Sequence, residues 1–246
     1  MIKYLTNTFP IINLYKEPSI KSEVITQMIY GESFSISKKK NKWLKIKIKE
    51  DNYKGYILNR NYSEYIKPTH KINKLNAKIY KFSNKKIKTN ELSFCSKVKV
   101  TNKKSQFYKF AKGWVNKNDV STIFFREKNP FKKIYIFKNV KYKWGGKSFK
   151  GIDCSALIQV CLNFNNIYCP RDAKDQIKYF KKNIKLDKIK KNDIIYWKGH
   201  VALALSSKKL IHAYGPEKKT LIMSINQTIK RIHKSANLKV TGIKRL

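Results

Sequence analysis

Residues 153–163 read Asp-Cys-Ser-Ala-Leu-Ile-Gln-Val-Cys-Leu-Asn, and this stretch decides the fold class of the second half of the chain. Apolar side chains recur at the spacing of one helical face, at Cys154, Leu157, Ile158, Cys161 and Leu162. Asp153 stands where a helix N-cap belongs, and the Asn-rich run after Leu162 favours a stop. We therefore expect an amphipathic helix that begins at Cys154.

Four short apolar runs follow this helix, at residues 194–197, 201–205, 210–213 and 221–225. Each has the length and composition of a β-strand, and turn residues separate them. A helix followed by consecutive antiparallel strands predicts an α+β domain, which we place at residues 123–246.

The first 120 residues have a different pattern. Residues 43–49, Trp-Leu-Lys-Ile-Lys-Ile-Lys, alternate apolar and charged side chains, as a half-buried strand does. The triplet Gly55-Tyr56-Ile57 is echoed by Gly113-Trp114-Val115. Several short strands at close spacing indicate small barrels. We predict two all-β barrels, at 1–68 and 69–122, ahead of the α+β domain.

The charge of the chain is strongly positive. Its 246 residues include 56 Lys and Arg against 15 Asp and Glu, a formal net charge of +41. Basic composition with interleaved aromatics is typical of nucleic-acid binders. Here, however, 51 of the 56 cations are Lys, spread along the whole chain, whereas Arg is the residue preferred for bidentate phosphate recognition. Lys, Asn and Ile share A/T-rich codons, so we favour genomic base composition and expect no specific nucleic-acid partner.

The sequence also bears on membranes and location. No run of 18 apolar residues exists, so we expect no transmembrane helix. The first seven residues lack the apolar core of a secretion signal, which favours a cytoplasmic protein, with export by another route as the alternative. The oligomeric state is left open.

Four cysteines, at positions 95, 154, 161 and 169, include no Cys-x-x-Cys pair. A disulfide framework and a zinc site are therefore not expected, and no motif calls for a cofactor. Free cysteine is commonly a small buried hydrophobe, our expectation for Cys95, Cys161 and Cys169. Cys154 differs because it occupies the first turn of its helix, where the helix dipole favours a thiolate. We expect a lowered pKa and a nucleophilic role there.

Two of the four histidines fall in predicted strands. His200 shares a strand face with Ala202 and Ala204, which leave room in front of its ring. A three-residue loop at 206–208 would place His212 opposite Ala202 and within reach of His200. A two- or four-residue loop would place the two rings on opposite faces, and the sequence leaves both possibilities open. We expect His70 and His233 to be surface residues.

Four motifs together resemble the NlpC-type cysteine peptidases of bacterial cell-wall peptides. They are Tyr142-Lys-Trp-Gly-Gly146, Asp153-Cys-Ser-Ala-Leu157, Gly199-His-Val201 and Ile211-His-Ala213, in the family's order and spacing. The run Asp193-Ile-Ile-Tyr-Trp197 and the triplet Pro170-Arg-Asp172 match as well. The barrels resemble bacterial SH3-like domains through Tyr53-Lys-Gly-Tyr56. The resemblance implies a papain-like catalytic domain and a murein peptide as substrate, cleaved between γ-D-glutamate and a diamino acid.

The resemblance also implies roles for particular residues. Cys154 would be the nucleophile, His200 its base and His212 the group that orients His200. Tyr142, Asp153 and Ser155 correspond to residues that hold the amino end of the substrate.

Other positions are less defined by the resemblance. Arg171 fits either a structural ion pair or a contact to a substrate carboxylate. Tyr53 is a candidate wall residue of the site. Two departures from the family pattern are Ala156, usually Gly, and Ala173, often a hydroxyl residue.

We therefore expect a cysteine endopeptidase that acts on free L-Ala-γ-D-Glu-diamino acid peptides in cell-wall recycling. One alternative is an exported hydrolase of the intact wall, whose barrels and lysines would bind polyanionic polymer. The other is a non-catalytic module that binds nucleic acid or wall polymer.

Overall fold

The computed structural model describes residues 2–246, which form two compact units. The first contains the residues up to Lys128 together with 147–149 and 163–166, and the second contains 129–146, 150–162 and 167–246. The predicted domains 1–68 and 69–122 both fall in the first unit, and two short pieces of the predicted domain 123–246 fold with them. Among the described residues, no helix is long and apolar enough to cross a membrane.

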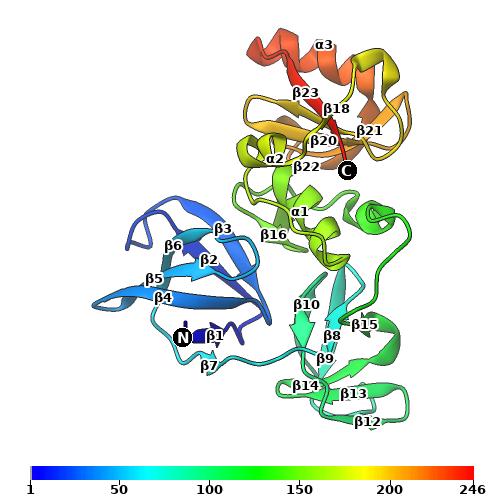
Figure 1. Ribbon diagram of the computed structural model, residues 1–246. Helices are drawn as coiled ribbons and strands as arrows, with labels where there is room; N and C mark the ends of the chain where they lie inside the picture. Colours follow the sequence, from blue (N-terminus) through cyan, green and yellow to red (C-terminus); the bar gives the residue numbers. More distant parts are fainter. Residues whose placement is uncertain (1) are drawn as a thin grey trace. The chain divides into compact units, whose positions relative to one another are not determined.

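The first barrel is a seven-stranded sheet with the order β3-β2-β6-β5-β4-β1-β7 (Figure 1). Its strands are β1 (Tyr4–Thr6), β2 (Ile11–Tyr15), β3 (Val24–Ile29), β4 (Ser33–Lys40), β5 (Trp43–Ile48), β6 (Lys54–Leu58) and β7 (Ser63–Glu64). On β5, Leu44, Ile46 and Ile48 are buried and the intervening lysines are exposed, which confirms the predicted strand. Alternation of side chains across the pleat is what buries one face of this strand.

The second barrel is built from two sheets, β10-β9-β14-β13-β12 and β11-β8-β15. Their strands are β8 (His70–Ile72), β9 (Asn76–Tyr80), β10 (Lys88–Ser93), β11 (Lys97–Val98), β12 (Asn102–Lys104), β13 (Phe107–Phe110), β14 (Gly113–Asn116) and β15 (Val120–Thr122). It packs tightly on the first barrel at Gly31, whose φ is +81° and where an added Cβ would lie 2.0 Å from the Lys97 carbonyl oxygen. Only glycine fits this backbone contact.

Two later segments complete the first unit. The Lys147 Nζ lies 2.7 Å from the Glu32 Oε1, and these side chains are only 1% and 4% exposed. The Phe164 ring stacks on Phe94 with centroids 4.7 Å apart. The buried Lys71 ammonium donates to the Phe164 carbonyl oxygen. Burial of these charged groups is possible because each has a partner.

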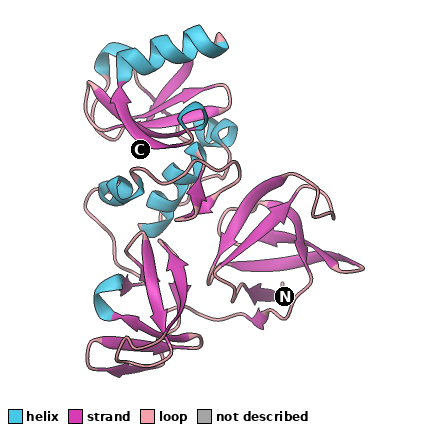
Figure 2. Ribbon diagram, turned by 180° about the vertical axis from the view of Figure 1, so that it is seen from behind, coloured by secondary structure: helices cyan, strands magenta, loops and turns pink. Residues whose placement is uncertain are grey.

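The second unit combines three α-helices with a six-stranded sheet (Figures 1 and 2). The sheet has the order β18-β23-β19-β20-β21-β22. The elements are β17 (Gly151–Ile152), α1 (Cys154–Phe164), α2 (Ala173–Tyr179), β18 (Lys182–Asn183), β19 (Ile194–Trp197), β20 (His200–Ala204), β21 (Lys209–Tyr214), β22 (Lys219–Ser224), α3 (Ile225–Ala236) and β23 (Val240–Arg245). The short strand β16 (Lys147–Ser148) and the last two residues of α1 belong to the first unit. The predicted α+β class, the helix from Cys154 and the strands at 194–205 and 210–213 are confirmed.

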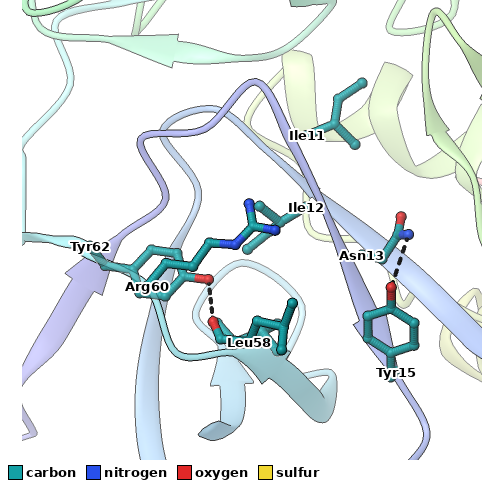
Figure 3. Close-up of a pocket in the computed structure, with 8 residues that line it drawn as sticks. Ile11, Ile12, Asn13, Tyr15, Leu58, Arg60 and Tyr62 are labelled. Atoms are coloured by element: carbon teal, nitrogen blue, oxygen red, sulfur yellow. Dashed lines mark hydrogen bonds between the residues drawn. The ribbon is translucent and has the colours of Figure 1, made fainter. Parts of the chain in front are cut away.

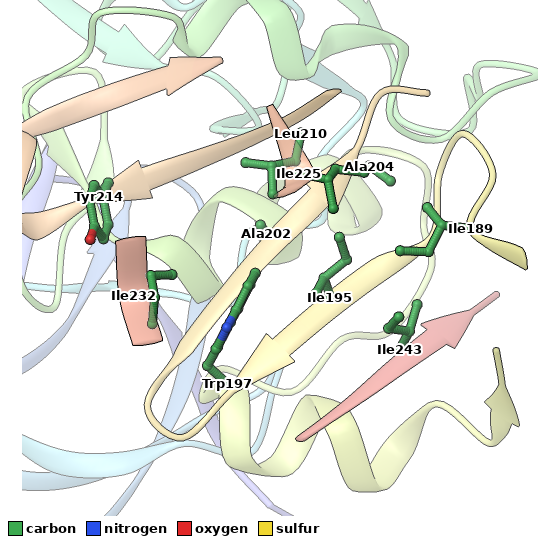
Figure 4. Close-up of a cluster of buried hydrophobic side chains, with 10 residues drawn as sticks. All are labelled: Ile189, Ile195, Trp197, Ala202, Ala204, Leu210, Tyr214, Ile225, Ile232 and Ile243. Atoms are coloured by element: carbon green, nitrogen blue, oxygen red, sulfur yellow. The ribbon is translucent and has the colours of Figure 1, made fainter. Parts of the chain in front are cut away.

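The sequence did not identify α3. The apolar run at 221–225 was expected to be one strand, but β22 ends at Ser224 and α3 begins at Ile225. In Figure 4, Ile225 lies beside Leu210 and Ala204 in the buried cluster of this unit. Ile225, Ile229 and Ile232 have helical spacing, but the polar residues between them hid the pattern. Residues Lys132–Phe137 form a 3₁₀-helix near the start of the predicted domain 123–246.

Candidate active site

The amino end of α1 is held by a buried polar cluster. Asp153 caps the helix: its Oδ1 accepts from the Ala156 amide at 2.8 Å and from the Ser155 hydroxyl at 3.2 Å. The Arg171 guanidinium donates to both carboxylate oxygens, Nη1 to Oδ1 at 3.0 Å and Nη2 to Oδ2 at 2.5 Å. Nη1 also donates to the Ser155 Oγ at 2.9 Å. This network fixes the first turn of α1, which begins with Cys154.

The structure shows one of the two possible roles of Arg171. Its side chain is only 1% exposed and forms a bidentate ion pair with Asp153. Planar guanidinium and carboxylate groups favour this geometry. The structure therefore shows the ion pair, and the contact of Arg171 with a substrate carboxylate stays a prediction.

The Cys154 sulfur lies beside β20. Cys154 is buried, and its sulfur accepts hydrogen bonds from the backbone amides of Val201 and Ser155. Burial and the nearby Asp153 charge raise the pKa of the Cys154 thiol to about 12. The expectation of a lowered pKa is wrong, because desolvation of the thiolate outweighs the amides of the helix terminus. The thiol is therefore protonated at neutral pH.

The histidine pair depends on the register between β20 and β21. Leu203 pairs with Ile211 and Ala204 with Leu210, and the Leu205 amide donates to the Lys209 carbonyl. This is the three-residue loop at 206–208. It places His212 diagonally from His200, and His200 Nε2 lies 2.9 Å from His212 Nδ1.

Both imidazoles are neutral at physiological pH. Burial lowers the pKa of His200 to about 4. Burial, His200 and the Arg231 charge lower the pKa of His212 to about 3. The Tyr214 ring stacks on His212, with centroids 4.7 Å apart and planes within 11°. A neutral His200 can accept a proton, as a general base must.

Tyr142 lies close to Cys154 as well. Burial, together with Cys154 and Asp153, raises the pKa of the Tyr142 hydroxyl. Its amide donates to the Lys218 carbonyl at 2.8 Å, and its ring lies against Gly215. The structure therefore brings Tyr142, Asp153 and Ser155 to the predicted nucleophile, as the sequence motifs indicated.

Tyr53 belongs to the first unit. Its side chain packs partly buried against the core of the first barrel. Its role as a wall of the site stays a prediction.

A separate hollow of about 150 Å³ lies in the first barrel (Figure 3). It is lined by β2 and by the segment from Ile57 to Tyr62. Its lining residues are Ile11, Ile12, Asn13, Tyr15, Ile57, Leu58, Arg60 and Tyr62. None of them is a Cys or His, so this hollow is not the thiol site.

Two neighbours of the histidines were missed by the sequence analysis. Tyr214 follows His212 by two residues on one strand, so its position on the same face could have been noticed. Met223, whose Sδ lies 3.4 Å from His212 Nε2, could not, because its place depends on the register between β21 and β22.

Comparison with known proteins identifies two domains. Residues 139–236 match the NlpC/P60 family, and residues 14–61 match the bacterial dipeptidyl-peptidase SH3 domain. The γ-D-glutamyl-L-lysine dipeptidyl-peptidase of Bacillus subtilis (strain 168) is 27% identical over 233 residues, which cover 83% of this chain and 77% of that protein. Dipeptidyl-peptidase 6 of Lysinibacillus sphaericus is 40% identical over 72 residues, which cover 29% of this chain and only 27% of that protein.

Solved structures agree on the fold. An NlpC/P60 family protein from Bacillus cereus ATCC 10987 matches with a TM-score of 0.83 at 18% identity, covering 98% of this chain and 99% of that one. An NlpC/P60 endopeptidase from Photobacterium damselae subsp. piscicida matches with a TM-score of 0.60 at 12% identity, covering 98% of this chain and 70% of that one. The chain therefore carries a cysteine peptidase domain of the NlpC/P60 family, preceded by a bacterial SH3 domain.

Proposed function

We propose that this peptidase cleaves the bond between γ-D-glutamate and a diamino acid in murein peptides, with Cys154 as nucleophile. The observation that carries the proposal is that α1, β20 and β21 bring Cys154, His200 and His212 together. The Cys154 sulfur accepts from the Val201 amide, directly after His200, and His200 lies 2.9 Å from His212. The names of the Bacillus relatives, γ-D-glutamyl-L-lysine dipeptidyl-peptidases, support this bond and a peptidoglycan-derived substrate.

The proposed reaction begins from a neutral pair. Because the pKa of Cys154 is raised and that of His200 is lowered, the thiol keeps its proton until the substrate is attacked. His200 then takes this proton as the sulfur bonds to the γ-carbonyl carbon. His200 returns the proton to the leaving amine, which gives a thioester and a free amino group. Water, deprotonated by His200, hydrolyses the thioester and regenerates the thiol.

The start of α1 supplies groups for substrate binding. The backbone amide of Cys154, at the positive end of the helix dipole, is the proposed donor to the oxyanion. Asp153 Oδ2 accepts from Arg171 Nη2 and has a further lone pair for a substrate ammonium. Tyr142 and Ser155 complete this proposed site for the amino end of a free peptide, which would select short peptides that begin with L-alanine.

Cleavage of free peptides favours a cytoplasmic role in recycling. The competing proposal is an exported enzyme that acts on intact wall, where the lysine-rich surface would bind anionic polymer. Incubation with soluble L-Ala-γ-D-Glu-L-Lys, with its diaminopimelate analogue and with insoluble sacculi, each analysed by mass spectrometry, separates the two. Recycling predicts cleavage of the tripeptides and no release from sacculi.

Two cysteine variants test the nucleophile. Cys154→Ala should abolish tripeptide cleavage, whereas Cys161→Ala, buried on the same helix, should retain it. His200→Ala should be as inactive as Cys154→Ala. Equal loss in both cysteine variants with the fold intact would refute the assignment, and full activity in Cys154→Ala would favour a binding module.

A further inference from the structure

The sulfur of Met223 faces the ring nitrogen of His212 that does not contact His200. His212 Nε2 lies 3.4 Å from the Sδ of Met223. Met223 pairs with Leu210 across the ladder, and His212 pairs with Leu221, so the Met223 and His212 side chains share one face of the sheet. The contact is thus fixed by strand register and does not depend on a loop.

In this contact the sulfur can act only as a hydrogen-bond acceptor. A thioether sulfur carries lone pairs and no hydrogen, so it can only accept. An imidazole nitrogen with its own lone pair would repel it, whereas an N–H would form a weak hydrogen bond. His212 is fully buried, and a neutral imidazole has a single N–H. If that hydrogen is on Nε2, Nδ1 is an acceptor.

The tautomer of His212 determines the tautomer of His200. Its Nε2 lies 2.9 Å from His212 Nδ1, and two nitrogens at this distance need one hydrogen between them. With His212 Nδ1 as the acceptor, His200 must carry its hydrogen on Nε2. His200 Nδ1 is then unprotonated and can take the Cys154 proton. In the opposite tautomer pair, His200 Nδ1 would carry a hydrogen and could not act as the base.

We propose that Met223 is a positioning residue whose sulfur selects the Nε2–H tautomer of His212 and, through it, the base-competent tautomer of His200. The proposal rests on the proposed function, since it assigns His200 as the base. Among the contacts of residues 2–246, Met223 is the one polar partner of His212 Nε2, and Glu217, in the turn after β21, is paired with Arg231. Tyr214 stacks on the ring and holds its plane without choosing a tautomer.

The test reads tautomers directly in the resting enzyme. Nitrogen-15 NMR of histidine-labelled protein distinguishes protonated from unprotonated ring nitrogens. In the wild type we expect hydrogen on Nε2 of both His200 and His212. Met223→Leu keeps the size of the side chain but removes the acceptor, so His212 should become a mixture of tautomers. Met223→Gln offers either an amide oxygen or an amide N–H to His212 Nε2, so it should keep a hydrogen bond there without fixing a single tautomer.

The kcat of each variant should follow its population of the base-competent tautomer. Met223→Leu should lower kcat roughly two- to tenfold at unchanged KM, the effect of losing one neutral hydrogen bond. The matched control is Met28→Leu in the core of the first barrel, which should change neither tautomer nor kcat. Hydrogen on Nδ1 of wild-type His212, or a Met223→Leu variant with unchanged tautomers, would overturn the proposal. An inactive wild type with the expected tautomers would overturn the proposed function instead.

Discussion

Replacing Arg171 with methionine removes a buried cation while keeping a long apolar stem. In the wild type, the guanidinium bonds both oxygens of Asp153, and the side chain is 1% exposed. The variant leaves the Asp153 carboxylate buried with only the Ala156 amide and the Ser155 hydroxyl as donors. Breaking a buried ion pair by removing one partner costs about 3–5 kcal/mol of unfolding free energy. We expect a loss of that size, together with reduced cleavage, because Cys154 follows Asp153 directly.

Urea unfolding followed by tryptophan fluorescence measures this loss by linear extrapolation. The double variant Asp153→Asn/Arg171→Met removes both charges and should be at least about 2 kcal/mol more stable than the sum of the single losses predicts. This difference measures the interaction energy of the ion pair separately from the packing energy lost with the arginine stem.

Arg231→Met is the matched control. Its Nη2 lies 2.5 Å from the Glu217 Oε1, the same separation as in the buried pair, but the two side chains are 45% and 31% exposed. Exposed pairs contribute about 0–1 kcal/mol, so this variant should lose little. If Arg171→Met cost no more than Arg231→Met, burial would not be what makes the Asp153 pair strong, and the reasoning would fail.

Three further predictions concern acid, a second buried pair and a loop. Because burial lowers the pKa of His200 to about 4 and of His212 to about 3, the unfolded chain binds more protons below pH 6.5. Urea titrations should therefore show stability falling as pH drops from about 6.5 to 4, and a flat profile would contradict this. Lys147→Met leaves the Glu32 carboxylate buried without its cation, with the Ile29 amide as a donor, and should cost about 3–5 kcal/mol by thermal unfolding, partly recovered in Lys147→Met/Glu32→Gln. Gly146→Ala would place a Cβ 2.5 Å from a backbone oxygen, so tripeptide assays should show slower cleavage; wild-type rates would count against this.

Sequence periodicity was sufficient for the parts of the fold that depend on local pattern. The stripe from Cys154 to Leu162 marked α1, and the alternation at 43–49 marked β5. The motifs also named the residues that meet at the amino end of α1. What the sequence left open was the register between β20 and β21, which depends on the length of one loop.

Other features depended on packing that no local pattern reports. The dipole of α1 argued for a lowered pKa of Cys154, but the desolvation that raises it comes from elements far away in the chain. The ion pair of Arg171 could not be predicted, because its partner Asp153 lies 18 residues away in the sequence. The helix α3 was missed because its few isoleucines lie among polar residues.

The buried pair of Glu32 and Lys147 has a consequence for how the protein matures on the ribosome. Chains emerge amino end first, at about 5–20 residues per second, so Glu32 precedes Lys147 by about 6–23 seconds. During that interval the carboxylate must remain hydrated. The same holds for the Phe94 ring, whose stacking partner Phe164 emerges later still. The first unit therefore cannot complete its core until residues 147–149 and 163–166, which precede and follow Cys154 in the sequence, have been synthesised.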